Sequence, residues 1–194
     1  MKVTVQQEHL ARGLATVGRA VATRSTLPVL SNILLETDES RLKLSATNLE
    51  MGITCWIAAQ VDEHGAITVP ARLLADFVNS LPPSPVVMDL DGRRQTLSVG
   101  ADRYQAEIKG IDAADFPILA TVEQGVRFTM DPLALRSMIN QVAISAASDE
   151  SRPILTGVLM QIDPDSGVLT LAAADGFRLS VREAELDAAL DGKL

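Results

Sequence analysis

The sequence predicts an α+β protein made of two copies of one unit, the second of them incomplete. Three observations carry this prediction. The segment around Leu30 recurs around Leu155, 125 residues later. Apolar residues follow helical spacing in some stretches and strict alternation in others. Hydrophobic residues make up 47% of the chain but aromatic residues only 3%, so the core is expected to be aliphatic.

The repeat extends on both sides of this segment. Leu10, Leu14 and Val17 fall over Leu135, Ile139 and Val142 at the same offset. After a two-residue insertion, Leu42, Leu44 and Ala46 fall over Leu169, Leu171 and Ala173 at an offset of 127. A fixed offset of this kind is typical of duplicated structural units.

The elements of the first unit follow from periodicity and turn signals. Lys2–Gln6 alternates as a strand does, and residues 7–21 carry the apolar stripe of an amphipathic helix. Pro70 suits the start of a second helix, because proline fits the first helical turn. The remaining expected elements are strands at 27–37, 41–47, 51–61, 66–69, 86–90, 95–99 and 103–109, and the second helix at 71–80.

Residues 111–124 show little periodicity and are expected to connect the units. The second unit is then expected to hold a helix at 132–146 and strands at 154–162, 168–174 and 177–185. We expect domains at 1–120 and 121–194, the latter comprising the connection and half a unit. The counterpart of the helix at Pro70 would begin near residue 197, so sheet edges and an apolar face would stay uncovered and residues 125–194 would be the less stable part.

The bulk composition excludes several classes of protein. No apolar run approaches the ~20 residues that a membrane helix needs. The start, MKVTVQQEHL, lacks a hydrophobic signal region, so a cytoplasmic protein without membrane partners is expected. Cys55 is the only cysteine, which excludes an intrachain disulfide, and it is expected to be a small core residue. The net charge of −8 argues against nucleic-acid binding unless basic residues gather on one face.

Catalytic, cofactor and metal sites are not expected. His9 and His64 are the only histidines, and Cys55 has no partner at metal-ligand spacing. The aspartates are scattered over predicted turns, and no phosphate-binding glycine loop is present.

One string of residues in the second unit is unusual. Ala173–Leu179 reads AADGFRL, in which Asp175-Gly176 predicts a tight turn and places Arg178 and Leu179 at the start of the next strand. This string could equally be an ordinary hairpin turn. Together with KVTV at the start, the string from Thr26 to Asn32, Ala46–Glu50, Val69–Arg72 and Asp115-Phe116-Pro117, however, it resembles the bacterial DNA polymerase III beta subunit, the sliding clamp of replication.

The resemblance runs over the whole chain and implies a DNA-clamp fold. Clamps of this family have three similar domains per chain, and two chains close head to tail into a ring around duplex DNA. Helices line the inner face and antiparallel sheets form the outer face. The resemblance implies an N-terminal portion with the first domain and half of the second. It implies an accessory subunit without enzymatic activity of its own, whose partners are the polymerase III catalytic subunit, the clamp loader and other proteins with a clamp-binding motif.

The DNA-facing residues are expected on the helices and the loops that follow them. Arg12 and Arg19 are seven residues apart on the first predicted helix and should share a face. Arg136 forms a similar polar pair with Asn140 on the helix expected in the second unit. The resemblance adds Arg24, Arg72 and Arg152, the last in the loop from Ser148. A sparse basic lining suits sliding, because phosphate contacts carry no sequence information. Each arginine could instead only solvate its helix, and Asp149 and Glu150 would repel phosphate in that loop.

The resemblance also implies a pocket for partner peptides. Its residues in this chain are Leu155, Ala174, Gly176, Phe177, Arg178 and Leu179. The rest of the pocket would lie beyond Leu194, so we expect at most weak peptide binding. Three functions remain open: a processivity clamp, a clamp-like interaction module that does not encircle DNA, and a metal-dependent nuclease that shares the fold.

Overall fold

The structure, a computed structural model, describes residues 1–23, 25–119, 128–163 and 165–186. The chain divides into two compact units, Met1–Ala120 and Thr121–Leu194. Each unit is described by itself.

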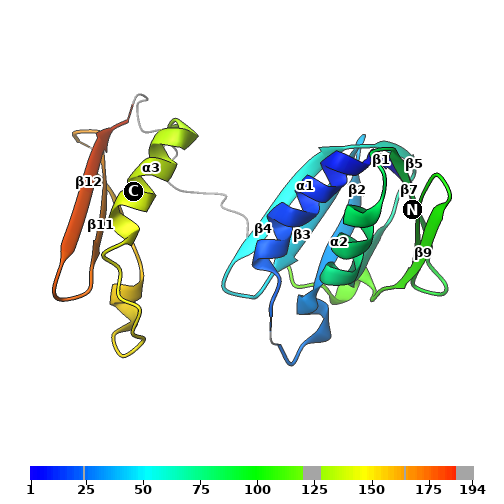
Figure 1. Cartoon of the computed structure of the whole chain (residues 1–194), viewed down its shortest axis with the longest axis horizontal. Coiled ribbons are helices and arrows are strands. Elements are labelled where there is room, and N and C mark those ends of the chain that lie inside the picture. The colour runs from blue at the N-terminus through cyan, green and yellow to red at the C-terminus, as the bar shows by residue number, and fades with distance from the viewer. Residues whose placement is uncertain (24, 120–127, 164, 187–194) are drawn as a thin grey trace. The chain divides into compact units, whose positions relative to one another are not determined.

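The first unit contains two antiparallel sheets and two α-helices (Figure 1). One sheet has the order β5-β1-β7-β8-β9 and the other β4-β3-β2-β6. Helix α1 lies on β3 and β4 and beside α2. The bounds are β1 Lys2–Gln6, α1 Gln7–Val17, β2 Asn32–Asp38, β3 Arg41–Thr47, β4 Gly52–Ala58, β5 Gln60–Glu63, β6 Ala66–Pro70, α2 Ala71–Ser80, β7 Pro85–Asp91, β8 Thr96–Ala101 and β9 Tyr104–Lys109.

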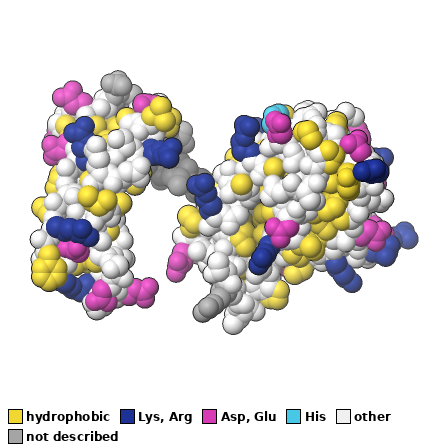
Figure 2. All heavy atoms as spheres, viewed as in Figure 1, with side chains coloured by type: hydrophobic (Ala, Val, Ile, Leu, Met, Phe, Trp, Pro, Cys, Tyr) yellow, Lys and Arg dark blue, Asp and Glu magenta, His cyan; other side chains and the backbone are white. Residues whose placement is uncertain are grey.

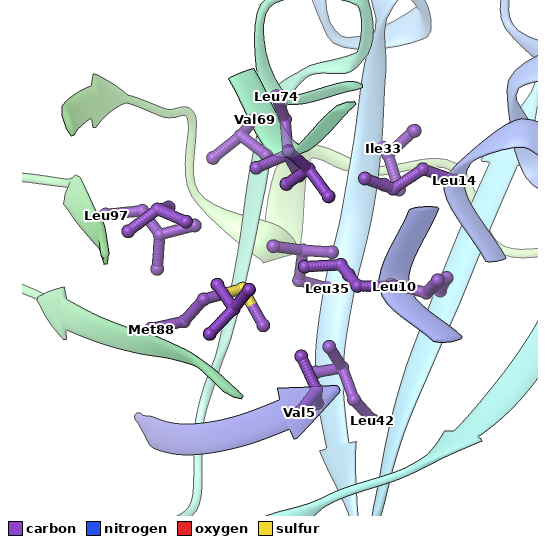
Figure 3. Packing of buried hydrophobic residues seen from close by; sticks show 14 of the residues in the cluster. Val5, Leu10, Leu14, Ile33, Leu35, Leu42, Val69, Leu74, Met88 and Leu97 are labelled. Atoms are coloured by element: carbon purple, nitrogen blue, oxygen red, sulfur yellow. The ribbon is translucent and has the colours of Figure 1, made fainter. Parts of the chain in front are cut away.

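The aliphatic core of this unit lies between the sheets and the helices. Figure 3 shows Leu10 and Leu14 of α1 converging with Leu35 and Leu42 of the strands. Gly13 lets the helix approach the sheet closely, since a Cβ atom there would stand 2.5 Å from Leu44 Cδ1. The core therefore depends on an apolar stripe of α1 that faces the sheet, and on Gly13, which carries no side chain where the helix comes closest to β3.

The second unit has one described helix and one sheet. Helix α3 (Pro132–Ala143) begins at Asp131, whose carboxylate accepts the backbone N–H of Ala134 at 3.0 Å. The sheet order is β10-β11-β12, with bounds Leu159–Asp163, Val168–Ala174 and Leu179–Glu185. The helix packs on β11 and β12, where Leu169 and Leu171 are fully buried.

The predicted repeat of α+β units is confirmed by strand register. In the first unit Leu35 pairs with Leu44, and Leu44 pairs with Cys55. In the second unit Met160 pairs with Leu171, and Leu171 pairs with Arg182. These are the same positions displaced by 125 residues for β10 and by 127 for β11 and β12. Helix, strand order and pairing are thus duplicated together.

Three predicted strands differ from the structure, because apolar content alone shows neither where a turn replaces a strand nor where the chain passes from one sheet to another. The start of the strand expected at 27–37 is a 3₁₀ helix, Pro28–Ser31, and its counterpart in the second unit is Pro153–Thr156. Proline fixes φ near −65° and donates no hydrogen bond, which favours such a turn. The strand expected at 51–61 is two strands, β4 and β5, which belong to different sheets.

The helix expected at 7–21 ends at Val17 and continues as a 3₁₀ turn, Gly18–Ala20. Arg19 therefore lies in this 3₁₀ turn and not on the α-helix that carries Arg12. Cys55, expected in the core, is half-buried on β4 at the edge of the core cluster.

The described part of the expected connection packs on the first unit. Ile111 forms a bridge with Thr68, and residues Ala113–Asp115 form a 3₁₀ turn capped by Asp112. Phe116 is buried in a small cluster with Val29 and Leu30, against which Leu119 also packs. This segment therefore covers the face of the β4-β3-β2-β6 sheet that is turned away from α1.

We predict that Phe116→Ala lowers the free energy of unfolding of the first unit by about 3 kcal/mol, since it removes a buried ring. Trp56, the only tryptophan, reports on this unit in a urea titration followed by fluorescence. Ile118→Ala is the matched control, because Ile118 is 99% exposed in the same segment. Equal effects of both changes would contradict the packing described here.

The second unit is predicted to be cut by protease before the first. Its described core cluster has four buried residues, Met138, Val142, Leu169 and Leu171, whereas the main cluster of the first unit has 24. Local opening is easier where fewer apolar contacts are lost. Limited proteolysis with mass spectrometry should find early cuts after residue 128 and late cuts before residue 110. Equal resistance of the two units would contradict the prediction.

Candidate nucleic-acid and peptide interface

The arginines predicted on the helices are all exposed where the structure describes them. Arg12 lies on α1 and borders a groove of about 330 Å³ between α1 and β4, with Cys55 and Trp56 on the opposite wall. Burial raises the pKa of the Cys55 thiol. Arg136 is exposed on α3, and Arg19 is exposed in the 3₁₀ turn. Arg24 lies outside the described residues.

Arg72 has a neighbour of opposite charge that the sequence analysis did not weigh. On α2 its guanidinium lies 3.6 Å from the Asp76 carboxylate, one helical turn away. Both side chains are largely exposed, so the pair contributes little stability. Figure 2 shows basic and acidic side chains interspersed on the face that carries α1 and α2. Cations are therefore sparse on this face, and an acid lies beside Arg72.

Asp149 shapes the loop that precedes the 3₁₀ turn Pro153–Thr156. The Asp149 carboxylate accepts the backbone N–H of Ser151 at 3.0 Å and its hydroxyl at 2.7 Å. The hydroxyl bond is the main reason that the pKa of Asp149 is lowered. Ala147 N–H donates to the carbonyl of Leu155 and closes the loop. Asp149 thus has a structural role, which accounts for an acid in a loop expected to meet phosphate.

The Asp175-Gly176 turn forms as predicted. Gly176 has φ +93°, a backbone conformation that side-chain-bearing residues rarely adopt. The Asp175 carboxylate accepts the backbone N–H groups of Phe177 and Arg178 and a bond of 2.9 Å from Arg178 Nε. The turn leaves the ring of Phe177 98% exposed.

The loop and the turn meet at one pocket of about 210 Å³. It is bordered by residues 146–149, Ser151 and Arg152 on one side and by Asp175, Phe177 and Arg178 on the other. The guanidinium of Arg152 lies over Gly176. A Cβ atom added at Gly176 would stand only 3.3 Å from Arg152 Nη2. The structure therefore brings a predicted DNA contact, Arg152, together with two predicted peptide-pocket residues.

The other predicted peptide-pocket residues lie next to this pocket but do not border it. Leu155 is half-buried in the 3₁₀ turn, Ala174 is half-buried at the end of β11, and Leu179 is exposed at the start of β12. Ala146 and Ala147, which also border the pocket, were missed by sequence reasoning. Their methyl side chains carry no chemical signal, and only the fold places them beside the turn.

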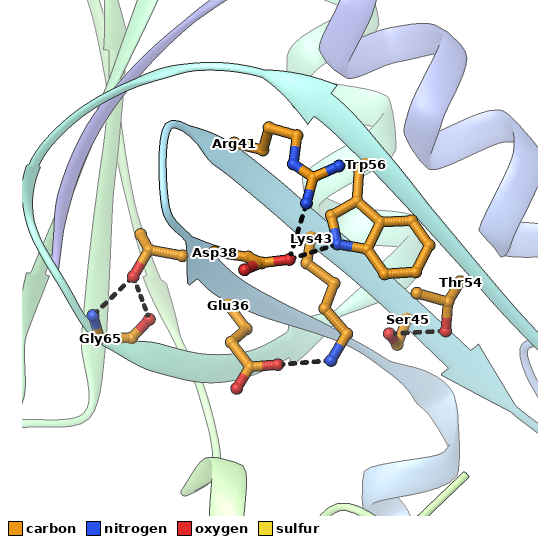
Figure 4. A network of polar contacts seen from close by, with 9 residues as sticks. Glu36, Asp38, Arg41, Lys43, Ser45, Thr54, Trp56 and Gly65 are labelled. Atoms are coloured by element: carbon orange, nitrogen blue, oxygen red, sulfur yellow. Dashed lines mark hydrogen bonds and ion pairs between the residues drawn. The ribbon is translucent and has the colours of Figure 1, made fainter. Parts of the chain in front are cut away.

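A separate polar network covers the solvent side of β2, β3 and β4 (Figure 4). Trp56 Nε1 donates to Asp38 at 2.7 Å, and Arg41 lies 5.7 Å from the centre of the Trp56 ring. Lys43 and Glu36 form an ion pair of 2.9 Å across neighbouring strands. Glu36 and Asp38, the two acids of this network, therefore lie on strand β2.

Among the described residues, no group of three or more His, Cys, Asp and Glu side chains is arranged to hold a metal ion. Within the same ranges, no helix has the length and hydrophobicity needed to cross a membrane.

Comparison with known families matches both units. Residues 1–120 match the DNA polymerase III beta subunit N-terminal domain, and residues 129–193 match its central domain. The chain belongs to the DNA polymerase III beta subunit family. The resemblance seen in the sequence is thereby confirmed.

Relatives and solved structures of this family agree. The chain is 41% identical over 192 residues to the beta sliding clamp of Synechococcus elongatus and 35% identical over 183 residues to that of Escherichia coli. These matches cover 97% and 93% of the chain but 50% and 49% of the relatives, so the chain spans about half the length of the clamps it matches. The Caulobacter crescentus beta sliding clamp superposes with a TM-score of 0.90 at 32% identity, covering 97% of this chain and 51% of that one. The predicted clamp fold is confirmed.

We predict that the Asp175 carboxyl titrates below the ordinary value of about 3.9. Its pKa is lowered chiefly by the hydrogen bond from Phe177 N–H and further by Arg178. Because the pKa of Asp175 is lower in the folded state than in the unfolded state, the ionised carboxylate stabilises the fold at pH values above the unfolded-state pKa. This contribution is lost as the pH falls through the folded-state pKa. An NMR pH titration of the side-chain carboxyl carbon measures the midpoint, and a midpoint at or above 3.9 would contradict the hydrogen bonding.

Proposed function

We propose that this chain acts as part of a DNA sliding clamp, the processivity factor of a replicative DNA polymerase. The observation that supports the proposal most strongly is the match of both units, in order, to the N-terminal and central domains of the beta subunit. The whole clamp tethers polymerase to duplex DNA, so that rebinding is effectively intramolecular. The proposal includes the ring of two chains, joined head to tail, that the family resemblance implies.

The DNA contacts in this proposal are electrostatic and few. Arg12, Arg19, Arg72, Arg136 and Arg152 are exposed cations on helices or on the loops that follow them, and Arg24 is kept as a sequence-based assignment. Attraction by a few cations is independent of sequence and depends on salt, which permits movement along the duplex. Asp76 beside Arg72 reduces the contribution of that residue.

The partner site in this proposal is the surface around the Asp175-Gly176 turn. Leu155, Ala174, Gly176, Phe177, Arg178 and Leu179 would bind peptides of the polymerase catalytic subunit, the clamp loader and other clamp-binding proteins. A related clamp from Bartonella birtlesii, with a TM-score of 0.89 and 30% identity, is described as bound to griselimycin. Small apolar contacts beside a basic edge suit short peptide ligands.

The proposed role is non-enzymatic and cytoplasmic. Polymerase activity would belong to the holoenzyme, with this protein as an accessory subunit. A protein that works on chromosomal DNA in a bacterium acts in the cytoplasm. The alternative role is a clamp-like interaction module that does not encircle DNA.

Retention on circular DNA separates these two roles. The chain is loaded on nicked circular plasmid, and retention is compared before and after linearisation, with its oligomeric state measured by light scattering. A closed ring is lost when the circle is cut, because it can slide off an end. Equal retention on both forms would rule out encirclement by this chain and favour the interaction module.

We predict that Arg12→Ala and Arg136→Ala each weaken binding to a 30-base-pair duplex at low salt. Each lost phosphate contact should reduce the slope of log K against log salt by about 0.9. Fluorescence anisotropy over a salt series measures both quantities. Arg93→Ala is the matched control, because Arg93 is exposed in the β7–β8 turn. An unchanged slope for both helix variants would remove these residues from the DNA surface.

A further inference from the structure

The loops that follow α1 and α3 are closed by the same backbone hydrogen bond. In the first unit the N–H group of Ala22 donates to the carbonyl of Leu30 at 3.0 Å, and in the second unit Ala147 donates to Leu155 at 2.8 Å. The two bonds join equivalent positions of the repeat, 125 residues apart. Both loops are therefore held at their ends in the same way.

Between their ends the two loops differ. In the second unit the Asp149 carboxylate accepts the N–H and hydroxyl groups of Ser151 and thereby shapes its loop. The equivalent position of the first unit is Arg24, a side chain that only donates hydrogen bonds. Among the described residues of the first loop, one side chain bonds within it, that of Ser25, whose exposed hydroxyl accepts the N–H of Leu27 at 3.0 Å. The first loop therefore depends more on the support of its ends.

An aromatic ring from a distant part of the chain supplies that support. Phe116 forms a buried cluster with Val29 and Leu30, and Ala22 packs against this cluster. Phe116 and Val29 are each 8% exposed, and Leu30 is 2% exposed. Because Ala22 and Leu30 are the residues joined by the closing hydrogen bond, the cluster contacts both ends of the loop. Removing the ring would leave a cavity at the base of the loop.

Phe116 is itself held by contacts that do not involve the loop. Its segment begins at Ile111, whose N–H and carbonyl groups bond with the backbone of Thr68 at 2.9 and 3.0 Å. The Thr68 hydroxyl also donates to the Ile111 carbonyl and accepts the side-chain amide of Asn32, each at 3.0 Å. Thr68 and Asn32 are buried, and buried hydrogen bonds of this kind are costly to break. The position of the ring is therefore fixed from strands β6 and β2.

We infer that Phe116 is a positioning residue for the loop of residues 22–30, in which Arg24 is the only charged residue. Phe116 is buried, so it acts by holding the ends of the loop and makes no contact with DNA itself. The inference rests on the proposed function for the role of Arg24 in DNA contact. It makes the segment between the units part of the DNA-binding surface, because an unsupported loop loses more conformational freedom when its cation meets a phosphate.

A double-mutant cycle on the 194-residue chain tests this role. Binding to a 30-base-pair duplex is measured by fluorescence anisotropy over a salt series. Phe116→Ala is expected to weaken binding at low salt by about threefold or more and to reduce the slope of log K against log salt, because a phosphate contact is lost. In a chain that already carries Arg24→Ala, the same change should have an effect of less than about twofold, since coupled residues are not additive. Combined with Arg12→Ala, its effect should be additive.

Two further variants separate positioning from a loss of stability. Phe116→Leu keeps most of the apolar contact, so its affinity for the duplex should lie between those of the unchanged chain and Phe116→Ala. Ile108→Ala is the destabilising control, because Ile108 is 2% exposed in the main core cluster, and its affinity should equal that of the unchanged chain. Circular dichroism verifies that each variant is folded. Hydrogen exchange of the Ala22 and Leu30 amides should be faster in Phe116→Ala than in Ile108→Ala.

Additive effects of Phe116→Ala and Arg24→Ala would overturn the inference, as would equal weakening of DNA binding by Phe116→Ala and Ile108→Ala. Unchanged affinity in Phe116→Ala beside weaker binding in Arg24→Ala would overturn it as well. If Arg24→Ala leaves DNA binding unchanged, or if the chain binds no duplex, the proposed DNA role of Arg24 is rejected and hydrogen exchange decides the positioning by itself. Equal exchange of the Ala22 amide in Phe116→Ala and Ile108→Ala would then reject it, and faster exchange in Phe116→Ala would retain it.

Discussion

The packing of one helix across the same two strands in each unit is the constraint on which the rest of the structure depends. Leu10 and Val17 of α1 meet Leu42 and Leu44 of β3, and Val142 of α3 meets Leu171 of β11. With few aromatic residues, the core relies on close contact between aliphatic side chains, and close packing tolerates little change in volume. Gly13 provides the closest approach in the first unit.

This packing fixes which sheet face is left for other contacts. A strand directs successive side chains to opposite faces, so burying Leu42, Leu44 and Ala46 under α1 turns Lys43 and Ser45 the other way. In the first unit that second face carries the Trp56 network and the covering segment. In the second unit it carries exposed leucine and valine. Duplication thus produced two equivalent faces, and only the first has a described cover.

The same arrangement joins the two proposed activities of the second unit. The loop from Ser148 follows α3, and the Asp175-Gly176 turn joins β11 to β12, so both meet at one end of the sheet. Arg152 lies over Gly176 and borders the same pocket as Phe177. A cation that we propose for DNA contact and an aromatic ring that we propose for peptide binding therefore border one pocket.

The sequence by itself determined the repeat, the family, α2 and β3 to the residue, and the Asp175-Gly176 turn, because periodicity and turn chemistry are local properties. It misjudged residues 27–31 and the split between β4 and β5, since an apolar run does not reveal where the chain leaves one sheet for another. Only the tertiary structure decided that Asp76 pairs with Arg72, that Asp149 shapes its own loop, and that Phe116 is buried against Val29 and Leu30. Those outcomes depend on residues far apart in the chain or on side-chain geometry, neither of which a local pattern contains.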